Sequence, residues 1–239
     1  MKTAIVTGAT KGIGLAIVRR LLSQGYYVVG TYAHDEEAAQ QCSQLLSSIS
    51  PNFEIVRADQ ADRESMRSFA EQMLRRPSID CVVCNAGATL RCSLTEIRDE
   101  DWERTMHINV NSSLYLIRDI YANIPHNSRI IFIGSLMAIH PHGTSLAYGV
   151  SKAAVHALAL NLVKCFEGTN TTVNAIAPGF VETEWQAEKP QHIRDNIYNK
   201  SAVKRFATAD EVADAVEFCI NNGFVNGSVL EISGGYSFK

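Results

Sequence analysis

Residues 3–25 are TAIVTGATKGIGLAIVRRLLSQG, a stretch that predicts a β-strand, a glycine-rich turn and an α-helix in succession. The strand covers residues 3–7, and the apolar spacing of the helix runs from Leu15 to a stop at Gly25. Glycines let the backbone approach a ligand closely, and the start of the helix offers free N–H groups to a pyrophosphate. The stretch therefore predicts a dinucleotide phosphate site. Its spacing, G-x-x-x-G-x-G, departs from the general fingerprint G-x-G-x-x-G, so a tight turn without a ligand is the alternative at this point.

The pattern of a strand followed by a helix continues along the rest of the chain. Further strands are expected at residues 26–31, 53–57, 81–84, 129–133, 172–176 and 228–232, with helices at residues 35–48, 62–75, 99–122, from 148 onward and at 210–221. This alternation predicts a single-domain α/β fold over residues 1–239: a doubly wound, Rossmann-type, mostly parallel seven-stranded sheet with helices on both faces. In such a sheet, ligands bind beyond the carboxyl ends of the strands. An eight-stranded barrel is the second candidate, but it needs one more strand and helix and a phosphate site late in the chain.

The composition favours small-molecule ligands. The 239 residues include 22 Lys and Arg against 25 Asp and Glu, and the net charge of −3 gives neither a basic surface for nucleic acid nor an acidic tail. The first residues form too short an apolar run for a signal peptide, and no later run is expected to approach a membrane span. We therefore expect a cytoplasmic protein that binds neither nucleic acid nor membrane.

The six cysteines do not predict a metal site or a disulfide framework. Only Cys81 and Cys84 have the spacing C-x-x-C. Both lie within an expected strand, where positions i and i+3 point to opposite faces of the sheet. We therefore expect two small buried side chains here and no metal.

Ser135, Tyr148 and Lys152 are the candidates for catalysis. Ser135 follows an expected strand directly, and the i, i+4 spacing of Tyr148 and Lys152 places a phenol beside an ammonium on one helical face. A phenol has an ordinary pKa of about 10, and it exchanges protons poorly near neutrality unless a neighbouring cation stabilises its anion. Lys152 can supply that cation. The alternative is that Tyr148 only covers the start of the helix and Lys152 is solvated, because Tyr-x-x-x-Lys alone also arises by chance.

Taken together, these motifs resemble the short-chain dehydrogenase/reductase family over essentially the whole chain. The resemblance is carried by Thr7-Gly8 to Gly12-Ile13-Gly14, Asn85-Ala86-Gly87, Asn109, Ser135, Tyr148 with Lys152, and Val173-Asn174 to Pro178-Gly179. Two departures are Cys84, where the family more often has Asn, and the pair Gly149-Val150. The resemblance implies that Ser135 binds a substrate carbonyl and that Tyr148 donates a proton to it. It also implies that Lys152 holds the cofactor ribose and lowers the Tyr148 pKa, and that Asn109 anchors a water relaying protons to Lys152.

The same resemblance implies a nicotinamide cofactor that supplies a hydride. Its expected contacts are Gly8, Thr10, Lys11, Gly12, Ile13, Gly14, Tyr32, Asp59, Asn85, Ala86, Gly87, Tyr148, Lys152, Pro178, Gly179, Val181 and Thr183. NADP(H) is preferred to NAD(H), because Tyr32 stands where NAD-binding members usually carry an acid and because Lys11 offers a cation to a 2′-phosphate. Asp35 argues for NAD(H), although an acid also suits the start of a helix.

Within the family, residues 205–213 and 226–236 are similar to 3-oxoacyl-[acyl-carrier-protein] reductases of fatty acid biosynthesis. This likeness implies reduction of a ketone, small or bound to an acyl carrier, to a secondary alcohol. An NAD-dependent dehydrogenase of a sugar, steroid or other alcohol is the alternative, and a non-catalytic dinucleotide-binding regulator is an alternative of another class. The complete set of Asn109, Ser135, Tyr148 and Lys152 favours an enzyme, because a regulator needs no proton donor.

Two expectations concern surfaces. The helix after Lys152 is apolar on more than one face, which favours a homo-oligomer, and the family implies a homotetramer. Residues 180–201 are expected to cover the substrate. Residues 189–205 hold five Lys or Arg against one Asp, a bias that suits either an acidic carrier protein or an ordinary solvated face.

Overall fold

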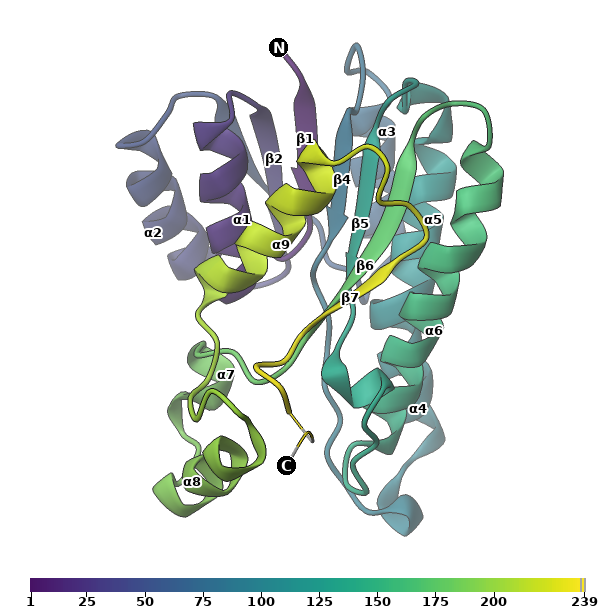
Figure 1. The fold of residues 1–239 in the computed structure, drawn as a ribbon. Helices are drawn as coiled ribbons and strands as arrows, with labels where there is room; N and C mark the ends of the chain where they lie inside the picture. The colour runs from purple at the N-terminus through teal and green to yellow at the C-terminus, as the bar shows by residue number, and fades with distance from the viewer. Residues whose placement is uncertain (237, 239) are drawn as a thin grey trace.

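The computed structural model describes residues 1–236 and residue 238, which form one layered α/β unit around a seven-stranded sheet (Figure 1). The strands are β1 (Thr3–Val6), β2 (Tyr27–Tyr32), β3 (Phe53–Arg57), β4 (Cys81–Cys84), β5 (Arg129–Ile133), β6 (Thr172–Pro178) and β7 (Val229–Ile232). Their order is β3-β2-β1-β4-β5-β6-β7, and every neighbouring pair is parallel. The doubly wound, Rossmann-type prediction is confirmed. The barrel is excluded because β3 and β7 are edges that do not pair with each other.

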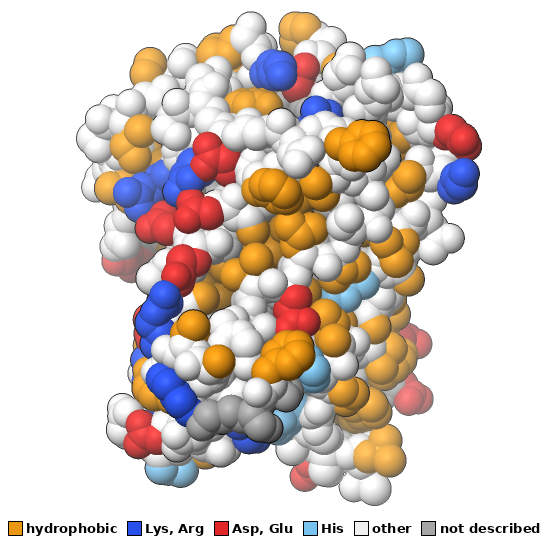
Figure 2. Space-filling model, viewed as in Figure 1, with side chains coloured by type: hydrophobic (Ala, Val, Ile, Leu, Met, Phe, Trp, Pro, Cys, Tyr) orange, Lys and Arg blue, Asp and Glu red, His pale blue; other side chains and the backbone are white. Residues whose placement is uncertain are grey.

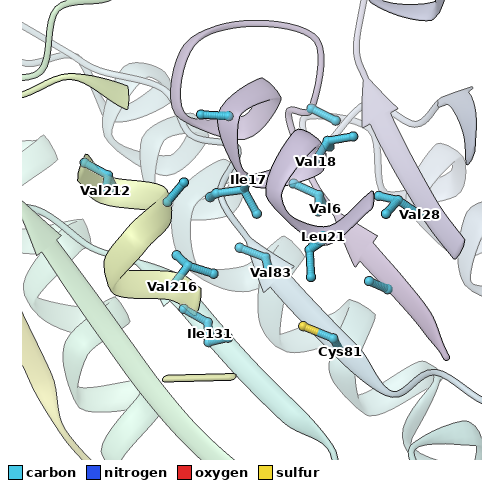
Figure 3. Close-up of a cluster of buried hydrophobic side chains, with 14 of the residues drawn as sticks. Val6, Ile17, Val18, Leu21, Val28, Cys81, Val83, Ile131, Val212 and Val216 are labelled. Atoms are coloured by element: carbon cyan, nitrogen blue, oxygen red, sulfur yellow. The ribbon is translucent and has the colours of Figure 1, made fainter. Parts of the chain in front are cut away.

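Helices cover both faces of the sheet (Figure 1). One face carries α1 (Gly12–Ser23), α2 (Glu36–Ser47) and α9 (Ala209–Asn221), and the other carries α3 (Arg63–Met73), α5 (Ser112–Asp119) and α6 (Leu146–Leu162). Successive strand residues point to opposite faces, so each central strand contributes to two apolar cores. The core under α1 and α9 contains Val6, Ile17, Val83, Ile131 and Val216 (Figure 3). The core under α3, α5 and α6 contains Ile5, Phe69, Val82, Phe132 and Val155.

The cysteine pair on β4 illustrates this alternation. Cys81 belongs to the core under α1, and Cys84 belongs to the core on the opposite face. The prediction that the two side chains point away from each other is therefore confirmed. Burial raises the pKa of each thiol to about 12, so both remain protonated near neutrality.

The long helix predicted over residues 99–122 is interrupted. The structure has α4 (Asp99–Met106), then a π-helical turn over His107–Asn111, then α5, and a short 3₁₀ turn at Tyr121–Asn123. A π turn adds a residue to the helical ring, which rotates the side chains that follow. Asn109 lies in this turn and is 2% exposed. A continuous apolar period does not reveal such a turn, so the sequence predicted one helix.

The segment between β6 and α9 contains two helices that the sequence did not predict. They are α7 (Glu184–Ala187) and α8 (Gln191–Lys200), and both lie beyond the carboxyl ends of the strands (Figure 1). Both helices are short, and most of their residues are polar or exposed, so they lack the apolar stripe by which longer helices are recognised.

The helix α6 begins at Leu146, two residues before the predicted start at Tyr148. With the turn that follows, residues Leu146–Phe166 form a 21-residue segment of mean hydropathy 1.3, long and apolar enough to cross a membrane by length and composition alone. The expectation that no run approaches a membrane span is therefore wrong for this segment. Its inner face packs on the sheet through Val155 and Ala159, and it also carries the buried Lys152. These contacts are those of a core helix.

Candidate active site

A cavity of about 530 Å³ lies at the carboxyl ends of the strands, where the sheet topology predicts a ligand. The predicted residues that line it are Gly8, Lys11, Gly12, Ile13, Gly14, Asn85, Ala86, Gly87, Ser135, Tyr148, Lys152, Pro178, Gly179, Val181 and Thr183. Thr10, Tyr32, Asp59 and Asn109 do not line it. Segments that follow β1, β4, β5 and β6 thus converge on one space, and residues of the segment with α7 and α8 form its remaining wall.

The glycine turn after β1 forms one end of the cavity. Gly8 and Gly12 have φ of +63° and +49°, values that side chains rarely allow, and a Cβ on Gly14 would lie 2.0 Å from the Gly8 carbonyl oxygen. The Asn85 amide fixes the turn by donating hydrogen bonds of 2.9 Å to the Thr7 and Gly8 carbonyl oxygens. No side chain caps the start of α1 at Lys11. The first N–H groups of α1 are therefore left for an anion.

Ser135 and Tyr148 lie together inside the cavity. Ser135 follows β5 and is 7% exposed, and its Oγ accepts a hydrogen bond from the Met137 N–H at 3.1 Å. Burial raises the pKa of Tyr148 above its ordinary value, while a hydrogen bond with the Ser135 hydroxyl and the charge of Arg91 act against this rise. The phenol is therefore protonated at neutral pH, which is the state of a proton donor.

Lys152 lies beside Tyr148, as the i, i+4 spacing predicted. Its Nζ is 5.8 Å from the centre of the Tyr148 ring and donates a hydrogen bond of 2.7 Å to the Ile133 carbonyl oxygen. Burial lowers the pKa of Lys152 to about 8. Burial outweighs the causes that lower the Tyr148 pKa, and Lys152 is not among those causes, so the expectation that Lys152 lowers this pKa stays a prediction.

Asn109 approaches the site from behind Gly87. Its Oδ1 accepts from the Ala88 N–H at 2.7 Å, and its Nδ2 donates to the Ala88 carbonyl oxygen at 2.9 Å and to Ser151 Oγ at 2.8 Å. A Cβ on Gly87 would lie 3.0 Å from Asn109 Oδ1 and 3.4 Å from Lys152 Nζ. The side chain thus ties the loop after β4 to α6 and lies close to Lys152. Its role in a water relay stays a prediction.

Tyr32 and Asp59, both expected to contact the cofactor, lie outside the cavity. Tyr32 ends β2, and the Asp59 carboxylate pairs with His34 Nε2 at 3.0 Å. Asp35 caps α2 by accepting from the Ala38 N–H at 2.9 Å, as its position at a helix start predicted. Its second oxygen accepts from Lys11 Nζ at 2.5 Å, which raises the pKa of Lys11 and lowers that of Asp35. Lys11 is therefore already paired.

Sequence reasoning missed His156, which supports Ser135 from behind. His156 is 8% exposed, and its Nε2 accepts from the Ser135 N–H at 3.4 Å. The ring fits because Gly134 has no side chain: a Cβ there would lie 2.1 Å from Nε2. Burial and the charge of Lys152 lower the pKa of His156 to about 4. The signal in the sequence was the spacing of four residues that continues from Tyr148 through Lys152 to His156.

Three more cavity residues were not among the predicted site residues, although two of them lie within residues 180–201 and Lys189 begins the basic stretch 189–205. Arg91 lies in the loop after β4, Trp185 lies in α7, and Lys189 lies between α7 and α8. Each is on an irregular or very short element, where periodicity does not predict which way a side chain points.

Comparisons with known proteins agree on the family across the chain. The family model described as Enoyl-(Acyl carrier protein) reductase matches residues 8–237. The chain is 31% identical to 3-oxoacyl-[acyl-carrier-protein] reductase FabG of Haemophilus influenzae over 98% of this chain and 97% of that protein. It is 28% identical to 2-dehydro-3-deoxy-D-gluconate 5-dehydrogenase of Pseudoalteromonas atlantica, over 98% and 95%. A short chain dehydrogenase from Burkholderia cenocepacia, solved in complex with NADP, is 28% identical and superposes with a TM-score of 0.92 over 98% of this chain and 97% of that one.

Proposed function

The chain belongs to the short-chain dehydrogenase/reductase family of oxidoreductases, and from this membership we propose that it reduces a ketone to a secondary alcohol with NADPH. The observation that supports the proposal most is that Ser135, Tyr148 and Lys152 line one cavity together with the glycine turn after β1. A hydroxyl, a protonated phenol and an ammonium beside a dinucleotide site are the groups that ketone reduction needs.

The shape of the cavity suits a dinucleotide. Gly14 has no room for a side chain, a Cβ on Gly87 would lie only 3.0 Å from Asn109 Oδ1, and the uncapped start of α1 suits a pyrophosphate. Gly8 to Gly14 would hold the phosphates, Asn85 to Gly87 and Lys152 the nicotinamide ribose, and Pro178 to Thr183 the nicotinamide end. When bound, the cofactor supplies the hydride.

The remaining chemistry is assigned to side chains of this protein. Ser135 donates a hydrogen bond to the carbonyl oxygen of the substrate and so stabilises the negative charge that develops there. Tyr148 gives its proton to the same oxygen, and the Lys152 ammonium then stabilises the phenolate that is left. Asn109 positions the loop after β4 and anchors the water that returns a proton through Lys152. Residues 180–201 cover the substrate as part of the single domain.

The preference for NADPH is supported by the solved NADP complex of the Burkholderia cenocepacia relative. Tyr32 offers no carboxylate to a ribose 2′-hydroxyl. The Lys11–Asp35 pair works against this preference, because a 2′-phosphate has to compete with Asp35 for the Lys11 ammonium. A comparison of kcat/KM for NADPH and NADH tests the assignment, and a higher value with NADH would contradict it.

The relatives support two substrates. The Haemophilus influenzae relative favours a 3-oxoacyl-[acyl-carrier-protein] reductase of fatty acid biosynthesis, with an acyl carrier protein as partner. The Pseudoalteromonas atlantica relative favours a dehydrogenase of a sugar acid. In both cases we place the enzyme in the cytoplasm as a homotetramer.

Oxidation of NADPH and NADH, followed by absorbance, tests the function against acetoacetyl thioesters and a panel of sugar, steroid and simple ketones. We expect turnover of at least one ketone. If the protein binds NADPH but oxidises it with none of them, the non-catalytic regulator becomes the better description. If Tyr148→Phe turns over the ketone as fast as the wild type, the protein is still a reductase, but Tyr148 is not its proton donor.

A further inference from the structure

The wall of the cavity around Tyr148 carries an excess of positive charge. Arg91, Lys189 and Lys200 line it from two sides, because Arg91 belongs to the loop after β4 while both lysines belong to the segment between β6 and α9. Glu184 is the one carboxylate among the lining residues that the structure describes. It belongs to the other end of the cavity: its Oε2 lies 3.9 Å from where a Cβ on Gly12 would be, and its charge acts on Lys11.

Arg91 and Lys189 differ from other cations of the same region in having no side-chain partner among the described residues. Arg194 pairs with Glu182, and Arg205 forms hydrogen bonds of 2.6 and 2.8 Å with Glu211. Within residues 1–236 and 238, neither Arg91 nor Lys189 forms an ion pair or donates a side-chain hydrogen bond. Their donors therefore remain available to a ligand in the cavity.

Arg91 and Lys189 line the same cavity as Tyr148. After burial, the charge of Arg91 is the largest cause that lowers the pKa of Lys189, and the same charge acts on Tyr148. Two like charges that line one cavity and have no acidic partner repel each other, and an anion between them removes that repulsion. Arg91 and Tyr148 line one cavity, so an anion bound by Arg91 can belong to the same molecule as the carbonyl that Tyr148 protonates.

We propose that Arg91 and Lys189 bind a carboxylate of the substrate, so that the enzyme acts on short oxo acids. The inference rests on the ketone reduction proposed above and names its substrate class. The planar guanidinium of Arg91 can donate two parallel hydrogen bonds to a carboxylate, and the Lys189 ammonium adds a second charge. A 3-oxoacyl thioester is neutral beside its ketone and leaves both cations without a partner. The charge of the site therefore favours the oxo acid over the thioester.

Matched ketones test this assignment. The values of kcat/KM with NADPH are measured for acetoacetate, for methyl acetoacetate, which has the same ketone without the charge, and for acetoacetyl-coenzyme A, which carries its phosphates far from the ketone. We expect acetoacetate to exceed the ester by about 10- to 100-fold, the usual effect of charge-assisted hydrogen bonds. Equal values for acid and ester, or a higher value for the coenzyme A thioester, would overturn the proposal.

Variants assign the effect to residues. Arg91→Gln together with Lys189→Gln should lower kcat/KM for acetoacetate about 100-fold and change that for the ester by less than about threefold. Arg91→Lys keeps a charge and should retain part of the activity on the acid. The control is Arg19→Gln, which removes an exposed arginine of α1 that does not line the cavity. This variant should leave kcat/KM unchanged for both acetoacetate and the ester. An equal loss on acid and ester would contradict the proposal.

A binding measurement separates this inference from the proposed function. Trp185 lines the cavity and is 60% exposed, so in a Trp102→Phe background its fluorescence reports on ligands. With NADP⁺ present, acetoacetate should quench Trp185, and the double variant should bind it about 100-fold more weakly. If no ketone is reduced, the reductase proposal fails, while this titration still decides whether a carboxylate binds at Arg91 and Lys189. Absence of acetoacetate binding would overturn the anion site alone.

Discussion

The proposed reaction requires the hydroxyl of Tyr148 as its proton donor. Tyr148→Phe keeps the ring that fills the buried site and removes the proton donor. We expect kcat/KM to fall by about two to four orders of magnitude, an increase of roughly 3–5 kcal/mol in the barrier, while cofactor affinity is retained. Steady-state kinetics and a fluorescence titration with NADPH measure the two effects separately. Loss of cofactor affinity equal to the loss of activity would show a binding role instead.

A second prediction at the residue scale concerns His156 and pH. Its pKa is lowered to about 4 in the folded protein, below the ordinary value of about 6.5 in the unfolded chain. The unfolded chain therefore takes up a proton between pH 6.5 and 4 that the folded protein does not, and the folded state loses stability over that interval as pH falls. The loss is about 2–3 kcal/mol in the free energy of unfolding.

Urea unfolding at pH 4, 5, 6 and 7 checks the prediction by comparing the wild type with His156→Gln, whose side chain can still accept a hydrogen bond but does not titrate. As pH falls from 7 to 4, the free energy of unfolding of the wild type should decrease relative to that of His156→Gln. A constant difference would show that the pKa of His156 is the same in the folded and unfolded states.

The sequence predicted the position of a site residue well only where its partner lies nearby in the sequence. Tyr148 and Lys152 lie four residues apart on one helix, so their proximity could be derived from helical geometry. The pKa of Tyr148 could not, because it is set by burial, which depends on the whole fold. Arg91 and Lys189 come together only through the packing of two irregular segments that are distant in the sequence.

At the scale of elements, α9 begins with a capping box whose contribution can be measured. Thr208 Oγ1 accepts from the Glu211 N–H at 3.2 Å, and Glu211 Oε2 accepts from the Thr208 N–H at 2.8 Å. Thr208→Ala removes the first bond and should lower the free energy of unfolding by about 1 kcal/mol, a shift of roughly 2–4 °C in Tm. Thr208→Ser keeps the hydroxyl and should remain close to the wild type. A Tm for Thr208→Ala equal to that of the wild type would show that water replaces the cap.

The sequence predicted the strands better than the helices for a physical reason. Central strands of a parallel sheet are buried on both faces, so β1, β4 and β5 are continuous apolar runs with clear ends. The π turn at His107–Asn111 and the short helices α7 and α8 depend on contacts with other segments, and their local sequence does not carry a period that distinguishes them.

At the scale of the whole molecule, two apolar surfaces lie exposed among the residues that the structure describes. The outer side of α6 exposes Leu146, Val150, Ala153, Ala157 and Leu160, spaced alternately by four and three residues. Phe218 of α9 is 48% exposed, and Phe224, between α9 and the edge strand β7, is 98% exposed. Figure 2 shows hydrophobic side chains gathered on the face where α9 and β7 lie. Two separate surfaces are what a tetramer with two kinds of twofold interface requires.

We therefore expect light scattering to give about four times the mass of one chain. Leu160→Asp places a charge in the α6 surface and should reduce the assembly to dimers, because one of the two interfaces is lost. Leu45→Asp on α2 exchanges a similarly exposed leucine outside both surfaces and should leave the mass unchanged. A wild-type mass equal to one chain would contradict the tetramer.

The order of the strands has a consequence for how the chain is made. Of the seven described strands β1 is synthesised first, but it lies in the middle of the sheet, and its second neighbour is β4, with Ala4 opposite Cys81. At about 5–20 residues per second, a ribosome delivers that partner roughly 4–15 seconds after β1. During this interval the nascent chain presents an unpaired apolar edge, which is the time at which chaperones are most needed. Nascent chains stalled before β4 has emerged should consequently be digested by protease much faster than those stalled after it.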